Sequence, residues 1–366
     1  MYPTVQSIFQ KKFDDSSLDL NSFNAKQKKV FNDIIRCRTY LCGCNRDICD
    51  SCGDIRTHYN SCKNPACPQC GAVDKELWIK KQELYVLDIK YFHIVFTIPD
   101  ELNPLVLLAP DIVYDILFRS SAHVLKSTAL DPKYLGAKIG FLSVLHTWGQ
   151  NLSLHPHVHM IVSGGGVTND GKWINSRKKF FVPVKVLSKR FSYFFLTELK
   201  SRFPVNRLKD KHQLQTIIDR CFSKEWVVYS KKPMKSPHHV IKYLGRYTHR
   251  IAISNGRIKD HSDNKVTFSY KDYRDRNKIK EMKLDENEFI RRFMMHVLPK
   301  GFTRIRYYGF LSNANKQERF KELRKFTSTK EPEVTQYKIT DIISKLIKKD
   351  VTICPHCGLR RHYQLE

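Results

Sequence analysis

Clustered cysteines constrain this chain more than any other feature of its sequence. Eight of the eleven cysteines in the 366 residues fall between Cys37 and Cys70. Two CxxC pairs stand out, Cys49–Cys52 and Cys67–Cys70, and each places two thiolates on a tight turn. Two such turns can close a tetrahedral zinc site, whereas inert core cysteines seldom occur as paired CxxC turns. The spacing therefore predicts a structural zinc ion held by Cys49, Cys52, Cys67 and Cys70.

The remaining cysteines leave a second metal site open. The cysteines of the same region that this assignment does not use are Cys37, Cys42, Cys44 and Cys62. The C-terminus contains half of another zinc knuckle, Cys354 and Cys357, which needs two ligands from elsewhere. Leftover N-terminal cysteines are one source of those ligands, and a second zinc site built in this way would bring the two chain ends together.

The charge balance indicates the class of partner. The chain has 64 Lys and Arg against 36 Asp and Glu, a net charge of +28, which favours polyanions. Nucleic acid is the first candidate and an anionic membrane surface the second. No segment approaches the roughly 20 apolar residues of a membrane span, and the N-terminus does not resemble a signal peptide. We therefore expect a cytoplasmic, nucleoid-associated protein whose thiols are reduced and free to bind metal.

The hydrophobic pattern predicts a mixed fold. Strands are expected at residues 91–98, 141–146 and 155–163, and a helix at 104–129. The glycines at 164–166 are expected to end the third strand in a turn. No GxGxxG or Walker loop is present. Strands and helices in this mixed order favour an α+β domain with a mostly antiparallel sheet.

Histidines at every second position mark the third strand. Alternate residues of a strand face the same way, so His155, His157 and His159 share one face while apolar residues occupy the other. Imidazoles side by side on a rigid strand form a platform for a divalent metal, with open positions for a phosphate oxygen. We predict His157 and His159 as ligands of Mg²⁺ or Mn²⁺, with Gln150 as the third ligand.

Other side chains could also approach this platform. His146 and His155 are contenders for the third ligand position. His93 would approach the histidines if the strand at 91–98 pairs with theirs, although a satisfied polar residue is the simpler interpretation of His93.

Two tyrosines supply candidate nucleophiles. Tyr243 and Tyr247 are four positions apart in a segment that follows Pro237 and has the pattern of a helix, so they share a helical face. A tyrosine hydroxyl becomes an effective nucleophile when a metal polarises the phosphate and cations stabilise the charge. The expected DNA-binding residues, which alternate or cluster with aromatic side chains, are Lys242, Arg246, Arg250, Arg304 and Arg306.

Several stretches of the sequence closely resemble the two-tyrosine HUH transposases of rolling-circle insertion sequences. The stretches that carry this resemblance are 60–64 with 67–70, 143–151 leading into the histidine strand, 243–255 (YLGRYTHRIAISN), 270–273 and 296–302. The resemblance implies that His157-Val158-His159 is the HUH motif and that Tyr243 and Tyr247 are the paired nucleophiles. It also implies a ferredoxin-like antiparallel-sheet nuclease domain behind an N-terminal zinc-binding module.

The resemblance implies a domain order and a reaction. The expected segments are a helical N-terminus at 1–36, a zinc-binding module at 37–71, a catalytic domain at 72–326, and a linker, helix and half-knuckle at 327–366. A tyrosine would nick single-stranded or hairpin DNA at transposon ends through a 5′-phosphotyrosine link and later rejoin it to target DNA, with the host replication machinery as a further candidate partner. A plasmid replication initiator or relaxase, and a non-catalytic zinc-dependent regulator, are the alternatives.

Overall fold

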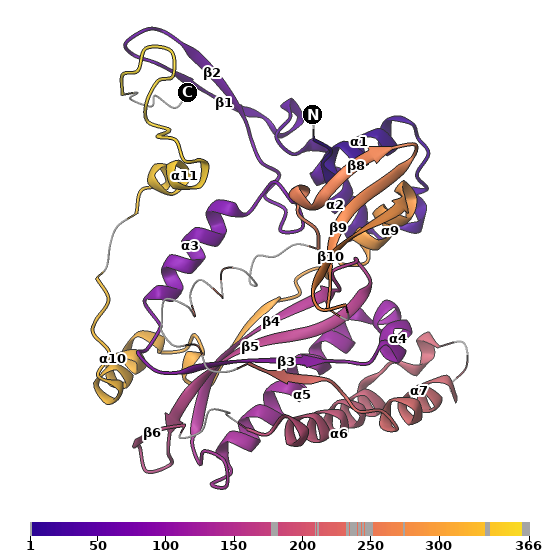
Figure 1. Cartoon of the computed structure of the whole chain (residues 1–366), viewed down its shortest axis with the longest axis vertical. Coiled ribbons are helices and arrows are strands. Elements are labelled where there is room, and N and C mark those ends of the chain that lie inside the picture. Colours follow the sequence, from indigo (N-terminus) through magenta and orange to yellow (C-terminus); the bar gives the residue numbers. More distant parts are fainter. Residues whose placement is uncertain are drawn as a thin grey trace.

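The structure, a computed structural model, describes residues 2–176, 182–208, 210, 212–231, 234, 240, 243, 245, 252–273, 275–333 and 337–360. Its centre is an antiparallel sheet in the order β11-β4-β5-β3-β7, with β6 paired to β5 (Figure 1). The strands of this sheet are β3 (Tyr91–Thr97), β4 (Lys138–Trp148), β5 (Leu154–Val167), β6 (Trp173–Asn175), β7 (Val228–Ser230) and β11 (Ile305–Tyr308). The expected α+β class and antiparallel sheet are therefore confirmed.

Helices cover one face of this sheet. They are α4 (Asn103–Leu108), α5 (Pro110–Leu130), α6 (Val184–Arg202) and α7 (His212–Phe222). Phe92 and Phe96 of β3 pack in one apolar core with Phe118 of α5 and Phe191 of α6, and all four side chains are fully buried. The helix expected at 104–129 is interrupted at Ala109, because the residue before a proline is pushed out of the helical region; its φ is −142° and its ψ is 64°.

The glycines at 164–166 do not form the expected turn. They continue β5, pairing with β4 on one side and β6 on the other. A Cβ on Gly164 would lie 2.6 Å from the Lys90 carbonyl oxygen, and one on Gly166 would lie 2.6 Å from that of Lys138. Glycine is needed here because neighbouring backbone approaches the strand too closely for a side chain, not because the chain turns.

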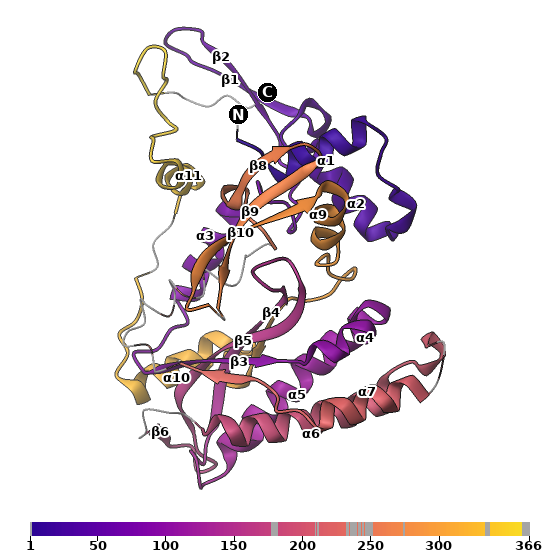
Figure 2. The same ribbon diagram turned by 45° about the vertical axis from the view of Figure 1, so that its right-hand side comes forward.

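A second antiparallel sheet and three helices form a separate core above the first sheet (Figures 1 and 2). The strands are β8 (Ile258–Ser262), β9 (Lys265–Asp272) and β10 (Lys278–Asp285), and the helices are α1 (Val5–Asp14), α2 (Ala25–Arg36) and α9 (Glu286–Met294). Within it Phe9 stacks on Phe31 and meets the ring of Phe293 edge to face. The N-terminal helices thus pack on residues that lie some 250 positions further along the chain, as the hydrogen bond from Val5 to Asn255 shows.

The remaining elements surround these two cores. They are the hairpin of β1 (Cys44–Ile48) and β2 (Ile55–Tyr59), and the helices α3 (Ala72–Glu83), α10 (Lys316–Thr327) and α11 (Ile339–Ile347). Both views place the segment that follows α11 beside the β1–β2 hairpin. In the part of the chain that is described, no helix is both long and apolar enough to cross a membrane.

Candidate active site

Three imidazoles meet on the sheet face that the helices α5–α7 leave uncovered. His146 of β4 is the register partner of His157 of β5, and His159 lies two residues further along β5. One ring nitrogen from each residue lies within 4.8 Å of the others. His146 is buried, whereas His157 and His159 are half-buried, so this cluster is accessible from one side. Three imidazoles with an open side fit a divalent metal that also binds a substrate oxygen.

Hydrogen bonds orient the ligands of this cluster. The Nδ1 of His157 lies 2.6 Å from the carbonyl oxygen of His155, where it can only donate. The Nδ1 of His159 lies 2.9 Å from the Nε2 of His93. Both contacts engage Nδ1 and therefore leave Nε2 for a metal. His93 reaches this position because Val95 of β3 pairs with His159, which puts the odd-numbered residues of β3 on the histidine face.

Tyr243 completes a hydrogen-bonded chain to the cluster. Its hydroxyl lies 2.7 Å from the Nδ1 of His93 and 3.0 Å from the Nε2, which His93 already uses for His159. The Nζ of Lys231 lies 5.8 Å from the centre of the Tyr243 ring. A candidate nucleophile, one histidine and a candidate metal ligand are thus linked in series.

His93 is neutral in this arrangement. Burial, together with the smaller effects of the charges of Lys231 and His157, lowers the pKa of His93 to about 3. A neutral imidazole carries one ring proton, so it donates one hydrogen bond and accepts another. When His159 binds a metal through Nε2, its Nδ1–H donates to His93, and His93 must then donate its own Nδ1–H to the oxygen of Tyr243.

Trp148 and Arg304 pack beside His146. Trp148 stacks on the His146 ring at 4.8 Å between centroids. The Arg304 guanidinium lies 5.1 Å from the centre of the Trp148 ring and donates to the Leu145 carbonyl. Burial lowers the pKa of Arg304 to about 10, which leaves it charged near neutral pH. His296 holds the loop between β4 and β5 in place, because its ring lies 3.2 Å from both the Thr147 hydroxyl and the Leu152 carbonyl.

Other predicted site residues have different surroundings. The Gln150 amide nitrogen lies 3.4 Å from the Tyr273 hydroxyl, beyond the end of β4. Arg306 forms an ion pair with Asp115 at 2.8 Å and stacks on Phe118, on the helix side of the sheet. The DNA-binding role of Arg304 and Arg306 stays a prediction. Four predicted site residues lie outside the described residues: Lys242, Arg246, Tyr247 and Arg250.

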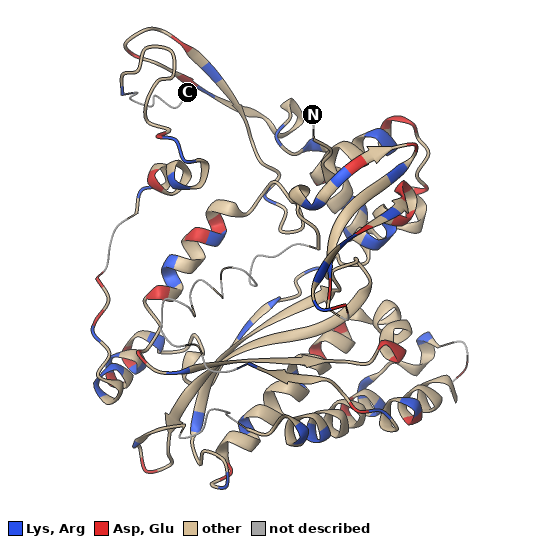
Figure 3. Cartoon of the chain, viewed as in Figure 1, with Lys and Arg blue, Asp and Glu red and all other residues tan. Residues whose placement is uncertain are grey.

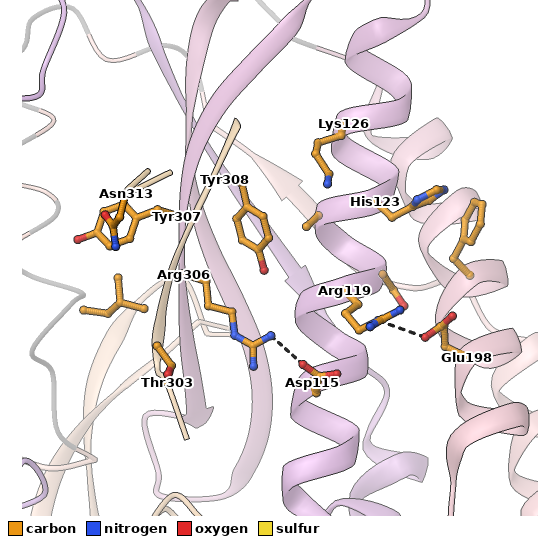
Figure 4. A pocket seen from close by; sticks show the side chains of 14 residues that line it. Asp115, Arg119, His123, Lys126, Glu198, Thr303, Arg306, Tyr307, Tyr308 and Asn313 are labelled. Carbon is orange, nitrogen blue, oxygen red and sulfur yellow. Dashed lines mark hydrogen bonds and ion pairs between the residues drawn. The ribbon is translucent and has the colours of Figure 1, made fainter. Parts of the chain in front are cut away.

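An open cavity lies beside Arg306. It has a volume of about 740 Å³ and lies between β11, α5 and α6 (Figure 4). Arg306 and Arg119 point into it, but each is paired with a carboxylate, Asp115 and Glu198 respectively. The strands that carry the histidine cluster have almost no charged residues, and Lys and Arg gather on the surrounding helices and loops (Figure 3).

The cysteines form two groups that differ from the predicted ligand set. Cys67 and Cys70 lie with Cys37 and Cys62, whereas Cys49 and Cys52 lie with Cys354 and Cys357. The prediction that joined the two CxxC pairs is corrected, because the β1–β2 hairpin separates them. Cys49 and Cys52 are at its tip and Cys67 and Cys70 follow its base, and five residues of strand span roughly 16 Å. Spacing along the sequence could not show this separation.

The fold and site define an α+β protein with a His-hydrophobic-His pair on an antiparallel sheet and a cysteine-rich N-terminal module. Two family models match the chain: one described as "Putative transposase" over residues 140–319, and one described as "Transposase zinc-binding domain" over residues 8–98. A protein named "Putative transposase y4qJ" from Sinorhizobium fredii is 40% identical over 97% of this chain and 93% of its own length.

A further relative names the type of element. The transposase for insertion sequence element IS801 from Pseudomonas savastanoi pv. phaseolicola is 30% identical over 76% of this chain and 69% of its own length. The solved structure of TrwC complexed with a 27-mer DNA matches 35% of this chain and 54% of that chain, at 14% identity and a TM-score of 0.24. The chain belongs to the family of insertion-sequence transposases that includes the IS801 protein, and it contains that family's zinc-binding domain.

Proposed function

We propose that this transposase nicks and rejoins single-stranded or hairpin DNA at the ends of its element through a covalent link to Tyr243. The observation that carries the proposal is the hydrogen-bonded series from the Tyr243 hydroxyl through His93 to His159, beside His146 and His157. A packing tyrosine would not need a buried, neutral histidine that connects it to a group of imidazoles.

Metal binding at the cluster is part of the proposal. We infer that His146, His157 and His159 hold Mg²⁺ or Mn²⁺, with His146 in place of the predicted Gln150. The register supports this choice, because His146 pairs directly with His157 across the sheet. A bound divalent ion would supply Lewis-acid polarisation of the scissile phosphate and neutralise part of its charge.

The chain's own groups perform the transfer. The Tyr243 oxygen attacks phosphorus, the bond from phosphorus to the 3′ oxygen breaks, and the departing 3′-hydroxyl carries the proton that the phenol loses. His93 donates its Nδ1–H to the tyrosine oxygen and so stabilises negative charge there, with Lys231 as the nearby cation. The same donor serves the reverse step, because the tyrosine oxygen is then the leaving group. The bond energy is conserved in the phosphotyrosine, so no nucleotide cofactor is needed.

The second predicted nucleophile and the neighbouring basic residues extend the proposed mechanism. Tyr247 would act on another strand end, and Lys242, Arg246 and Arg250 would contact phosphates next to it. These roles rest on their spacing from Tyr243 and on the net charge of +28. Target DNA would accept the transferred end, and the 3′-hydroxyl left at the nick would be available to the host replication machinery.

A nicking assay tests the proposal. Labelled oligonucleotides from both element ends are incubated with the protein in Mg²⁺, Mn²⁺ or EDTA, and covalent adducts are resolved on denaturing gels. We expect a protease-sensitive adduct that requires the divalent ion and is lost in the Tyr243→Phe, Tyr247→Phe double variant. An adduct that survives in the double variant, or one that forms equally well in EDTA, would refute the mechanism. The single variants assign the first attack.

A further inference from the structure

We propose that the chain carries a second structural zinc site, a tetrathiolate formed by Cys49, Cys52, Cys354 and Cys357, which fastens the C-terminal arm to the tip of the β1–β2 hairpin. We define the C-terminal arm as residues 328–360. The four cysteines form one group in the structure although the two pairs are about 300 positions apart in the sequence. The family's zinc-binding domain, matched at residues 8–98, contains only half of this ligand set.

The two halves of the site are the same turn built twice. In the hairpin, Cys49 N–H donates to the Asp54 carbonyl at 3.0 Å, and Gly53 N–H donates to the Cys49 carbonyl at 2.8 Å. In the arm, Cys354 N–H donates to the Leu359 carbonyl at 2.8 Å, and Gly358 N–H donates to the Cys354 carbonyl at 2.8 Å.

The glycine that follows each CxxC pair completes the likeness. Gly53 and Gly358 have φ values of 71° and 74°, a left-handed conformation that glycine adopts without strain. Two unrelated segments thus have the same backbone hydrogen bonds, and each presents two thiols to the other. A packing contact between a hairpin and a tail would not require this duplication.

Distances between the sulfur atoms fit zinc and exclude disulfides. The Sγ atoms of Cys49 and Cys357 are 3.7 Å apart, and those of Cys52 and Cys354 are 3.8 Å apart. A disulfide bond would require about 2.05 Å. In a regular tetrahedron with zinc–sulfur bonds of about 2.3 Å, the sulfur atoms are roughly 3.8 Å apart. The structure therefore holds the four sulfurs close to the positions of a zinc tetrathiolate.

Burial of the ligands matches a closed structural site. Cys49 and Cys354 are fully buried and Cys357 is half-buried, whereas Cys52 lies at the surface. The site lies at the end of a hairpin whose residues are mostly exposed, so few apolar contacts could hold it otherwise. A metal commonly replaces a hydrophobic core in segments of this size.

Metal analysis of the full-length protein tests the proposal. Inductively coupled plasma mass spectrometry should find two zinc ions per chain in the wild type. The Cys354→Ser, Cys357→Ser variant and the Cys49→Ser, Cys52→Ser variant should each retain one, and the variant with all four changes should also retain one. A matched control, Cys42→Ser with Cys44→Ser, changes two neighbouring cysteines outside both groups and should retain two.

Three results of the metal analysis would contradict the proposed zinc site. Two zinc ions in the Cys354→Ser, Cys357→Ser variant, iron in place of zinc, or losses that add up when the pairs are combined would each overturn the assignment. Additive losses of zinc would mean that the two cysteine pairs belong to different sites. The sequence-based prediction, which joined Cys49 and Cys52 to Cys67 and Cys70, implies such an arrangement.

A second measurement needs no variant and therefore does not depend on whether a variant folds. The zinc-loaded wild type is alkylated with iodoacetamide while a chelator is titrated, and the cysteines are followed by peptide mass spectrometry. Cys52 is the decisive residue, because it is solvent-exposed and only a bound metal would protect it. We expect Cys52 to become reactive in the same step as Cys354 and Cys357, after release of one zinc. Alkylation of Cys52 at full zinc occupancy would contradict the proposal.

Discussion

A single histidine connects the two chemical groups of the site. His93 lies between Tyr243 and His159, and its neutrality follows from burial and from the charges of Lys231 and His157. Its proton position depends on whether His159 coordinates through Nε2. In the proposed mechanism, metal binding would therefore determine which hydrogen bond the tyrosine oxygen receives, and one ring would couple the metal to the nucleophile.

Substitution of His93 tests this coupling. His93→Ala should lower the rate of adduct formation by roughly a hundredfold, since both the donor to Tyr243 and the partner of His159 are lost. His93→Gln keeps an N–H donor and should recover part of that rate. If His93 were only a packing residue, both variants would change stability alone, and the dependence of the rate on Mn²⁺ concentration would equal that of the wild type.

A second comparison at this scale concerns the third metal ligand. His146→Ala should abolish adduct formation at Mg²⁺ concentrations that saturate the wild type, because two imidazoles hold a divalent ion much more weakly than three. Gln150→Ala should stay within about threefold of the wild type, because its amide lies near Tyr273. Measured metal affinities in the opposite order would restore Gln150 as the ligand.

At the scale of elements, the tyrosine-bearing segment is placed by α3. Val240, Tyr243 and Gly245 are helical, and Val240 and Tyr243 pack in one cluster with Trp78 of α3 and Tyr307 of β11. Trp78 also donates to the Tyr307 hydroxyl at 3.1 Å. Gly245 is buried, and a Cβ there would lie 2.4 Å from the Cδ1 of Ile79. Close approach to α3 thus explains a glycine between two predicted nucleophiles.

Enlarging Gly245 should displace the nucleophile. Gly245→Val should slow adduct formation by roughly tenfold to a hundredfold, because a shift of about 1 Å in a reacting group can cost that much. Adding Ile79→Ala should recover much of the rate by making space, while Gly256→Val, at a position with no atom within 4 Å of the added Cβ, should have no effect. A slow variant that Ile79→Ala does not rescue would argue against packing on α3.

Ion pairs connect α9 to the N-terminal helix α1. Glu286 begins α9 with only 1% of its side chain exposed, and it lies 2.7 Å from Lys11 and 2.9 Å from Lys12 of α1. Burial alone would raise the pKa of Glu286, but hydrogen bonds from Lys11, Lys12 and His261 outweigh it and lower the pKa to about 2. The carboxylate therefore anchors the N-terminal helix to the second sheet domain.

Glu286→Gln should reduce the free energy of unfolding by about 3 kcal/mol, because it leaves the largely buried Lys12 without its charged partner. Since the folded pKa lies below the ordinary value of 4.5, the contribution is fully present above pH 4.5 and is lost as the pH falls towards 2. Urea unfolding of variant and wild type between pH 7 and pH 3 measures both effects. Glu288→Gln, whose carboxylate is 31% exposed beside Arg291, is the control and should cost less than about 1 kcal/mol.

Some features of the fold and the candidate site can be predicted from the sequence alone, and others cannot. The histidine strand and the mixed fold follow from local pattern, because alternation and turn residues act within a few positions. The cysteine grouping and the third histidine depend on which distant segments become neighbours. His146 joins His157 through strand register, and Cys49 meets Cys357 across the whole chain. The turn predicted at residues 164–166 was wrong for the same reason. These glycines are required by the close approach of adjacent backbone, which the local sequence does not reveal.

At the scale of the whole molecule, α3 contacts both the C-terminal arm and the tyrosine-bearing segment of the candidate active site. Helix α11 of the C-terminal arm packs against α3, and Lys80 of α3 lies over the Tyr337 ring at 4.7 Å. The same helix supports the tyrosine-bearing segment, because Trp78 packs in one cluster with Tyr243 and Ile79 lies close to Gly245. The proposed thiolate site is closed and the proposed imidazole site is open, and these two kinds of site differ in how they release metal.

Chelators should separate the two kinds of metal. Brief EDTA treatment should abolish adduct formation, and added Mg²⁺ should restore it, because an open imidazole site exchanges its ion readily. The unfolding temperature should barely change, since tetrathiolate zinc contributes about 10–16 kcal/mol of binding free energy and is released slowly. Prolonged treatment with a high-affinity zinc chelator should lower the unfolding temperature, and Mg²⁺ should not reverse this. Scanning calorimetry with parallel nicking assays measures both quantities. Loss of stability in step with loss of activity under EDTA would show that one metal serves both purposes.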